Sequence, residues 1–343
     1  MKIGWRGILG VVISVALLWW TLRGESFSEI WAVLRESNLA LFLLSAAVAT
    51  TTFPIRALRW RYILEPTAGT LPFGPLWRAT AIGMMVNNVS PARAGELARA
   101  FVLARETGRV RFTAALASLV VDRVFDAVVI LLLLLIVVLM PAFPAGAVIG
   151  SMPVDRVLLL GASVAIAAML VLIVFAMYPD KLVRIWEMML GQRAPKLMAR
   201  GREILQSFGA GLSVLKDPRR SLIVFLLALF GWLVNGASFW IAFHAVGIDA
   251  PFSAALFLQS LLAMAVAIPS APGFFGLFEA GAKVALGVYL VDDTLAVSYA
   301  LGYHLLSFIP ITLIGFWYLA RMGLHLKDMS SDAGRETGDA RPA

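Results

Sequence analysis

The stretch FTAALASLVVDRVFDAVVILLLLLIVVLM, which runs from Phe112 to Met140, decides the fold of this chain. It is long and apolar enough for a membrane-crossing helix, which needs about 20 such residues. Three ionisable residues interrupt it: Asp122, Arg123 and Asp126. At a rise of about 1.5 Å per residue they fall near mid-membrane, where an Asp or Arg costs roughly 2.5–3.5 kcal/mol. They must therefore face protein or water and partly neutralise one another.

The composition of the whole chain agrees with a membrane protein. Of its 343 residues, 60% are apolar and 15% are charged, whereas soluble domains have roughly 45–50% and about 25%. The absence of cysteine excludes disulfides and thiolate metal sites, and the three histidines lack metal-ligand spacing, so we expect no metal and no cofactor. The net charge of +8 fits cytoplasmic loops and anionic lipid headgroups, and we expect no nucleic acid partner.

The apolar pattern predicts an all-α, polytopic integral membrane bundle with about six full spans and two re-entrant broken-helix hairpins. Besides Phe112 to Met140, the expected spans are Gly7 to Leu22 (an uncleaved first span), Leu39 to Ile55, Val157 to Tyr178, Leu222 to Val246 and Leu295 to Ala320. Proline, glycine and polar residues break the stretches Pro72 to Pro91 and Phe252 to Val291. Irregular backbone at membrane depth must line a watery cavity or be buried by protein, so the two hairpins predict an internal polar site.

The distribution of the 29 basic residues sets the predicted orientation. Most of them, including Arg56, Arg59 and Arg61, fall on one side if both termini are cytoplasmic and both hairpins are re-entrant. We therefore expect a multi-pass protein of the inner (plasma) membrane. Its membrane domain would cover residues 1–326, with a cytoplasmic amphipathic segment at 179–220 and a disordered cytoplasmic tail at 327–343.

The two broken stretches resemble each other. The first contains MVNNVSPARAGELARA at 85–100 and the second contains AIPSAPGFFGLFEAGAK at 267–283. Each passes from an apolar helix through a proline turn and glycines into a short helix that carries a glutamate. Because they would face opposite sides, they suggest an inverted-topology repeat around a midplane site.

The first hairpin offers candidate ligands for a lipid phosphate. Pro91 should end a helix, and the amides that begin the next helix, near residue 92, favour an anion. The candidate substrate-binding residues here are Asn87, Asn88, Pro91, Arg93, Gly95, Glu96 and Arg99. The alternative is an interfacial helix whose arginines reach the headgroups.

The central span and the second hairpin supply the other candidates. Asp122, Arg123 and Asp126 lie within one turn, and Arg123 can pair with Asp126; they form either a structural cluster or part of the transport path. In the second hairpin the candidates are Pro272, Gly273, Gly276, Glu279 and Lys283. Spacing predicts a Glu279–Lys283 pair, which either contacts a headgroup or only neutralises itself. We interpret His304 as a hydrogen-bonded structural group.

The motifs NNVSPARAGELARAFVLARE, VDRVFD and PSAPGFFGLFEAG resemble the flippase-like membrane domain family related to the transmembrane part of lysylphosphatidylglycerol synthase. The resemblance extends from about Gly7 to Met322. It matches a turn followed by R-x-G-E and an arginine (Pro91, Arg93, Gly95, Glu96, Arg99), an acid-Arg-x-x-Asp motif (Asp122, Arg123, Asp126), and a glycine-rich hairpin ending in a glutamate (Pro272, Gly273, Gly276, Glu279). The family often has glutamate where Asp122 stands.

The resemblance implies a flippase that moves a phospholipid or polyprenyl-linked lipid between leaflets. After the last span we expect no room for the soluble domain that makes lysylphosphatidylglycerol, so synthesis by this chain is not expected. The alternatives are a membrane enzyme on a lipid-linked substrate, for which no nucleophile or metal motif is seen, and a non-catalytic scaffold for envelope lipid enzymes. The expected partners are membrane lipids with an anionic or lipid-linked headgroup. A homo-oligomer and a separate lipid-modifying enzyme remain open as protein partners.

Overall fold

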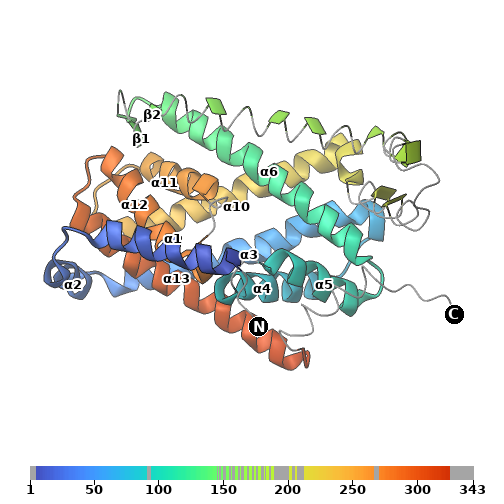
Figure 1. The fold of residues 1–343 in the computed structure, drawn as a ribbon, viewed down its shortest axis with the longest axis horizontal. Coiled ribbons are helices and arrows are strands. Elements are labelled where there is room, and N and C mark those ends of the chain that lie inside the picture. The colour runs from blue at the N-terminus through green and yellow to red at the C-terminus, as the bar shows by residue number, and fades with distance from the viewer. Residues whose placement is uncertain are drawn as a thin grey trace.

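The computed structural model describes residues 5–90, 94–144, 212–265 and 270–324, with scattered residues between 146 and 206. The described chain is an all-α membrane bundle, as predicted (Figure 1). Its helices are α1 (Trp5–Leu22), α2 (Phe27–Glu36), α3 (Leu39–Ala68), α4 (Phe73–Val89), α5 (Gly95–Thr107), α6 (Phe112–Leu139), α10 (Pro218–Ala245), α11 (Phe252–Ala265), α12 (Leu277–Val288) and α13 (Asp293–Arg321), with short 3₁₀ turns η2 (Ser213–Lys216) and η3 (Pro272–Phe274). Two-residue strands β1 (Val148–Ile149) and β2 (Met152–Pro153) pair antiparallel.

Three of the described helices are long and apolar enough to cross a membrane: α3, α10 and α13, with 30, 28 and 29 residues. Helix α6 matches them with 28 residues but carries the charges Asp122, Arg123 and Asp126. Helices α3 and α10 run antiparallel. The Asn38 amide before α3 donates to the Ala245 carbonyl at the end of α10, and Glu65 near the end of α3 lies 3.0 Å from Arg220 at the start of α10.

Helix α10 begins at a capping aspartate outside the bundle. Pro218 stands at the first helical position, where its missing N–H costs nothing. The Asp217 carboxylate accepts hydrogen bonds from the backbone amides of Arg220 and Arg219. The Arg220 bond is the main favourable cause that lowers the pKa of Asp217.

The two broken stretches form helical hairpins that enter from opposite ends of the bundle. Figure 1 places α4 and α5 at the end where α6 begins, and α11 and α12 at the end where α6 finishes. Helix α4 also contacts the turn η3, so the first hairpin reaches the tip of the second. Helix α1 packs along α12, where the Ser14 hydroxyl accepts a hydrogen bond from the Ala271 amide.

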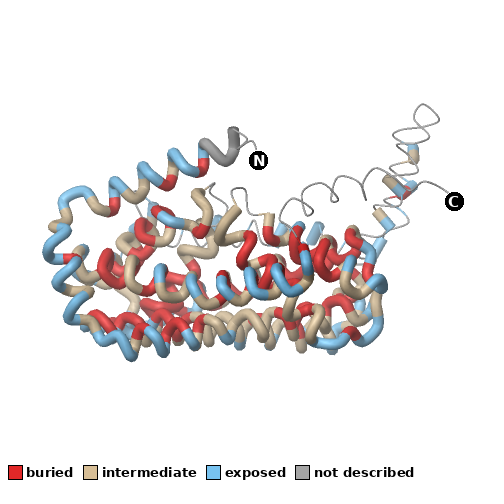
Figure 2. Tube along the Cα trace, turned by 90° about the horizontal axis from the view of Figure 1, so that it is seen from below, coloured by how far each residue is buried: buried red, intermediate tan, exposed pale blue. Residues whose placement is uncertain are grey.

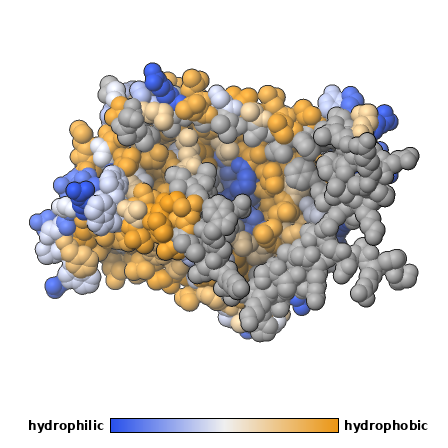
Figure 3. Space-filling view, in the orientation of Figure 1, coloured by the Kyte–Doolittle hydropathy of each residue, from blue (hydrophilic) through white to orange (hydrophobic). Residues whose placement is uncertain are grey.

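The surface is that of a protein immersed in lipid. Large apolar side chains such as Val15, Leu43, Leu226 and Leu313 are at least half exposed. Figure 2 shows buried residues on the inward sides of the helices and exposed ones outside. Hydrophobic atoms cover most of the described face in Figure 3, with a hydrophilic group near its centre. Away from the two ends of the bundle, the described outer surface is therefore mostly apolar.

One boundary prediction was wrong. The span predicted from Leu39 to Ile55 continues as α3 to Ala68, because Pro54 and Pro66 are both accommodated inside the helix. Arg56, Arg59 and Arg61 are therefore part of α3 and do not follow its end. The span predicted at 157–178 and the segment at 179–220 lie mostly outside the described residues, and the tail at 327–343 lies wholly outside them.

Candidate functional site

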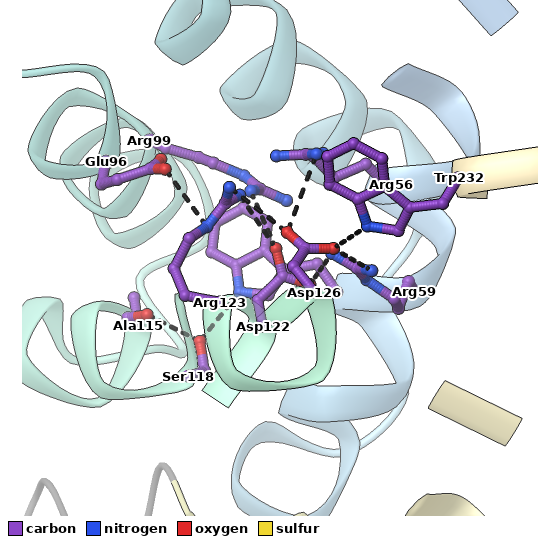
Figure 4. Close-up of polar contacts among 11 residues, drawn as sticks. Arg56, Arg59, Glu96, Arg99, Ala115, Ser118, Asp122, Arg123, Asp126 and Trp232 are labelled. Atoms are coloured by element: carbon purple, nitrogen blue, oxygen red, sulfur yellow. Dashed lines mark hydrogen bonds and ion pairs between the residues drawn. The ribbon is translucent and has the colours of Figure 1, made fainter. Parts of the chain in front are cut away.

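The two aspartates of α6 are neutralised by an arginine from α3. Asp122 and Asp126 stand one turn apart and are both buried. Nη2 of Arg59 lies 2.6 Å from Asp122 Oδ1 (Figure 4). Nη1 of the same guanidinium donates a hydrogen bond to Asp126 Oδ1 at 2.7 Å. Trp232 of α10 donates its indole N–H to the same Asp126 oxygen at 2.9 Å. Three helices thus meet on one buried carboxylate.

Further arginines surround this core. Arg123 lies 3.3 Å from Asp126 Oδ2, which confirms the predicted pair, and its Nε lies 3.5 Å from Glu96 on α5. Arg56 lies 3.8 Å from Asp126 Oδ2. With Arg99, four guanidinium groups of this described cluster face three carboxylates. The excess positive charge favours an anion in the vicinity.

Arg99 occupies the deepest position of the cluster. Its side chain is 0% exposed, its guanidinium carbon lies 4.2 Å from the centre of the Trp60 ring, and its Nη1 lies 3.6 Å from Asp122 Oδ2. Trp60 in turn donates to the Ser118 hydroxyl at 2.8 Å. The aromatic face and the carboxylate together compensate part of the cost of burying this cation.

A cavity of about 250 Å³ opens beside the cluster. Its polar lining comes from α3, α4, α6, α10 and α13: Thr52, Arg56, Arg59, Asn88, Asp126, Trp232, Asn235, Tyr303, His304 and Ser307. Gly273 and Phe274 at the tip of the second hairpin complete the wall. Both hairpin tips therefore reach one internal polar space, as the broken helices predict.

The second hairpin is held at its tip by a glutamate and a histidine. The Gly276 amide, at the start of α12, donates to Glu279 Oε2 at 2.6 Å. The other carboxylate oxygen, Oε1, lies 2.7 Å from His304 Nδ1, and His304 Nε2 lies 2.7 Å from the Gly273 carbonyl. Phe275 stacks on the imidazole with ring centres 4.5 Å apart. His304 is thus a hydrogen-bonded group, as predicted, and it joins α13 to the hairpin.

The comparisons with known proteins agree with this architecture. The family model described as the lysylphosphatidylglycerol synthase TM region matches residues 7–315. The chain belongs to this family. It is 25% identical over 325 residues to a UPF0104 membrane protein of Methanothermobacter thermautotrophicus, with 90% of each chain covered. A second UPF0104 membrane protein, from Methanocaldococcus jannaschii, is 23% identical over 68% of this chain and 92% of its own.

A third relative is longer than this chain. The glycosyltransferase AglD of Haloferax volcanii is 35% identical over 124 residues, which is 36% of this chain and 19% of the glycosyltransferase. The chain therefore spans about a fifth of that relative's length.

The predicted residues of the first hairpin have separate positions. Asn87 Oδ1 accepts from the Gly95 amide and so caps α5, while Asn88 lines the cavity and donates to Thr312 of α13 at 2.7 Å. Glu96 and Arg99 belong to the charge cluster. Pro91 and Arg93 lie outside the described residues.

In the second hairpin, the predicted Glu279–Lys283 pair is wrong. Glu279 turns back to cap its own helix and to bind His304. Lys283 instead contacts Glu25 at 2.6 Å and Asp293 at 3.2 Å, so it ties α12 to the α1–α2 turn and to α13. The helical spacing allows the predicted pair, but Glu279 and Lys283 each make shorter contacts with other residues of the folded chain. Pro272 and Gly273 form η3, and Gly276 precedes α12 at a φ of 84°.

Sequence reasoning missed the cavity-facing arginines of this family member. The predicted span ends at Ile55, which leaves Arg56 and Arg59 among the basic residues on the cytoplasmic side of the membrane. The apolar residues Trp60, Ile63 and Leu64, which continue at helical spacing, were the available signal that α3 goes on.

Proposed function

We propose that this membrane protein moves a phospholipid or polyprenyl-linked lipid between leaflets, with the headgroup in the central cavity and the acyl or prenyl chains in the bilayer. The observation that carries the proposal is the cavity itself, where both hairpin tips meet ionised side chains inside an apolar bundle. Buried charge at membrane depth is costly and marks substrate pathways. The family membership supports the same interpretation.

The charge of the site favours a phosphate-bearing headgroup. Arg56 lines the cavity, and its nearest described carboxylate, that of Asp126, is 3.8 Å away. It is therefore the guanidinium best placed to exchange a loose ion pair for a phosphate. Arg99 is fully buried beside Trp60, so a phosphate would reach it only after the cluster opened. Substrate binding thus begins at Arg56 and Asn88 in this proposal.

The proposed setting is the plasma membrane with both termini cytoplasmic. The beginnings of α6 and α10 and the ends of α3, α5 and α13 would then face the cytoplasm, close to Arg109, Arg111, Arg219 and Arg321. Supporting this assignment, cytoplasmic ends of membrane helices are enriched in arginine and lysine. Membrane lipids are the proposed partners, and the protein acts as a transporter, not as an enzyme.

The test is reconstitution into liposomes that carry labelled lipids with phosphate, phosphoglycerol, aminoacylated or polyprenyl-phosphate headgroups. Wild type should move at least one of them faster than empty liposomes do, and Arg56→Ala should slow it about tenfold, since a lost charge-assisted contact is worth roughly 1.5–3 kcal/mol. Arg61→Ala, on the same helix but away from the cavity lining, is the matched control and should keep the wild-type rate. Equal rates in wild type, Arg56→Ala and empty liposomes for every lipid would refute the proposal.

A second candidate is a membrane enzyme that acts on a lipid-linked sugar. The similarity to the glycosyltransferase AglD favours it. Purified protein incubated with a sugar nucleotide and polyprenyl phosphate distinguishes the two, because an enzyme would form a glycosylated lipid in detergent, where no leaflets exist. Absence of activity in both assays would favour the scaffold, and cross-linking to lipid-modifying enzymes would then be the informative measurement.

A further inference from the structure

The Glu279–His304 pair has a protonation state that its surroundings constrain. His304 Nε2 faces the Gly273 carbonyl at 2.7 Å, and a carbonyl can only accept, so Nε2 carries a proton. On the other side, Nδ1 faces Glu279 Oε1 at 2.7 Å, and a contact this short needs one proton between the two atoms. The second oxygen, Oε2, accepts from the Gly276 amide. The pair therefore holds one proton on the Nδ1–Oε1 link, whether as imidazolium and carboxylate or as imidazole and carboxylic acid.

Release of that proton would break one of the two contacts of His304. The neutral imidazole keeps a single N–H, on Nδ1 facing the Glu279 carboxylate or on Nε2 facing the Gly273 carbonyl, so the other contact would bring two acceptors together. Two acceptors at 2.7 Å repel, so either the ring or the oxygen that faces it must move. The ring also holds the Gly273 carbonyl, hence any rotation of His304 frees the hairpin tip as well.

The hairpin tip is a conformation that needs such support. Gly273 has a φ of 69° and Gly276 a φ of 84°, and Phe274 between them has a φ of 64°, which is unfavourable for a residue with a side chain. Strained backbone persists only where neighbouring contacts determine it. Among the described residues, those contacts include the hydrogen bond between His304 and the Gly273 carbonyl and the one between the Ser14 hydroxyl and the Ala271 amide.

The pair also has access to the transport cavity. His304, Gly273 and Phe278 line it, whereas Glu279 is fully buried behind them. Of the described ionisable groups, Arg56 and Arg59 of α3 and Asp126 of α6 line the same cavity, together with Tyr303 of α13. Lys283, one turn along α12, is paired with Glu25 and Asp293. The polar side chains Asn235 of α10, Gln259 of α11 and Asn88 of α4, which line cavities together with His304, are neutral.

We propose that Glu279 and His304 form a proton-binding site that couples proton movement to lipid movement through the adjacent cavity. This inference rests on the proposed function. With the proton bound, the pair holds the second hairpin tip against α13; when the proton passes to cavity water, the tip is released. The site exchanges one proton for each opening of the tip, and no other covalent bond is made or broken.

The first experiment measures lipid movement in proteoliposomes with equal and unequal pH on the two sides. For wild type, a gradient of one pH unit should change lipid accumulation by up to about tenfold if one proton moves with each lipid, and a protonophore should abolish the effect. Glu279→Gln keeps both hydrogen bonds, because its amide donates to Nδ1 and accepts from Gly276, but it cannot release a proton. It should therefore lose the response to the gradient, while Glu29→Gln, an exposed glutamate on α2, keeps it.

The outcomes separate the two proposals. Lipid movement that ignores the gradient in wild type overturns the coupling but leaves the transport function intact. An undiminished gradient response in Glu279→Gln overturns the assignment to this pair. No lipid movement at any pH removes the proposed function and the coupling with it.

A second measurement reads the site without transport. The chain has three histidines, so ¹⁵N-histidine NMR of the purified protein, with His304→Gln to assign the signal, follows each ring from about pH 5 to pH 9. We expect the ring nitrogens of His304 to respond to pH differently in wild type and in Glu279→Gln. An identical response in both proteins, or none in wild type, overturns the proton site.

Discussion

The two hairpins share a backbone design but differ in how their tips are held. The α4–α5 hairpin is closed by backbone proximity: the Gly83 carbonyl lies against Gly95, and Asn87 caps α5. Its charges, Glu96 and Arg99, belong to a network with α3 and α6 in which each carboxylate has an arginine beside it. The tip of the α11–α12 hairpin is held instead by its neighbours: the Ser14 carbonyl of α1 lies against Gly276, and His304 of α13 links Glu279 to the Gly273 carbonyl.

This difference assigns different tasks to the two halves of the bundle. A network in which four arginines lie against three acids is costly to open, so it supplies a fixed positive field beside the cavity. A lone acid–histidine link changes with a single proton, so it suits a movable part. The inverted repeat stays a prediction for the chain path, while the side-chain chemistry of the two hairpins differs.

The largest expected effect comes from breaking the fixed half. Arg59→Ala leaves Asp122 and Asp126 without their closest cation, which should lower the free energy of unfolding by about 3–5 kcal/mol. Glu279→Gln in the other half keeps its hydrogen bonds and should cost less than about 1 kcal/mol. Denaturant unfolding in mixed micelles, followed by circular dichroism, measures both.

Two further variants test whether this cost comes from the loss of the ion pairs. Asp126→Asn in the Arg59→Ala background removes one of the stranded charges and should recover part of the loss, because the two residues interact directly. Arg61→Ala should stay within about 0.5 kcal/mol of wild type. A cost below about 1 kcal/mol for Arg59→Ala would show that water already solvates the aspartates and that the network is not a fixed element.

Local sequence signals predicted the parts of this fold that local chemistry controls. The end of α4 at Val89 and the helix break at 272–276 follow from proline and glycine, and the charged residues of α6 indicate an internal site because lipid cannot hold them. Contacts between residues far apart in the sequence were harder to predict. Arg59 and Asp126 are 67 residues apart, and Lys283 meets Glu25 across 258 residues, whereas spacing arguments see only one or two helical turns.

The count of basic residues on each side of the membrane also misses one physical distinction. It treats an arginine after an apolar run as a headgroup contact, and it cannot tell such a residue from one that the next helix neutralises. For Arg56 and Arg59 the distinction depends on α6, which supplies the aspartates. Helix α6 carries two buried aspartates but only one nearby arginine of its own. This shortage of cations predicts that an arginine from another helix pairs with the aspartates.

An intermediate effect is expected from the backbone contact of the first hairpin. A Cβ on Gly95 would collide with the Gly83 carbonyl and with the Asn87 side chain, so Gly95→Ala should cost about 1–3 kcal/mol by forcing α4 and α5 apart. Gly287 in α12 has open space around its Cβ position, and Gly287→Ala should be neutral or stabilise by up to about 1 kcal/mol. A cost for Gly95→Ala as small as that for Gly287→Ala would mean that the close approach of Gly95 to Gly83 does not hold the first hairpin together.

The smallest effect should be confined to the second hairpin. Ser14→Ala removes the hydroxyl that accepts from the Ala271 amide at 2.6 Å, an interhelical bond worth about 0.6–1.5 kcal/mol. Because His304 still holds Gly273, the fold should persist while the tip opens more often. Amide hydrogen exchange of the peptide that contains Ala271 should accelerate roughly fivefold, with exchange in α5 unchanged. Ser28→Ala, an exposed hydroxyl that contacts only Ser26 among the described side chains, is the control. Acceleration spread equally over both hairpins would show that their tips move as one unit, and the division between a fixed and a movable half would fail.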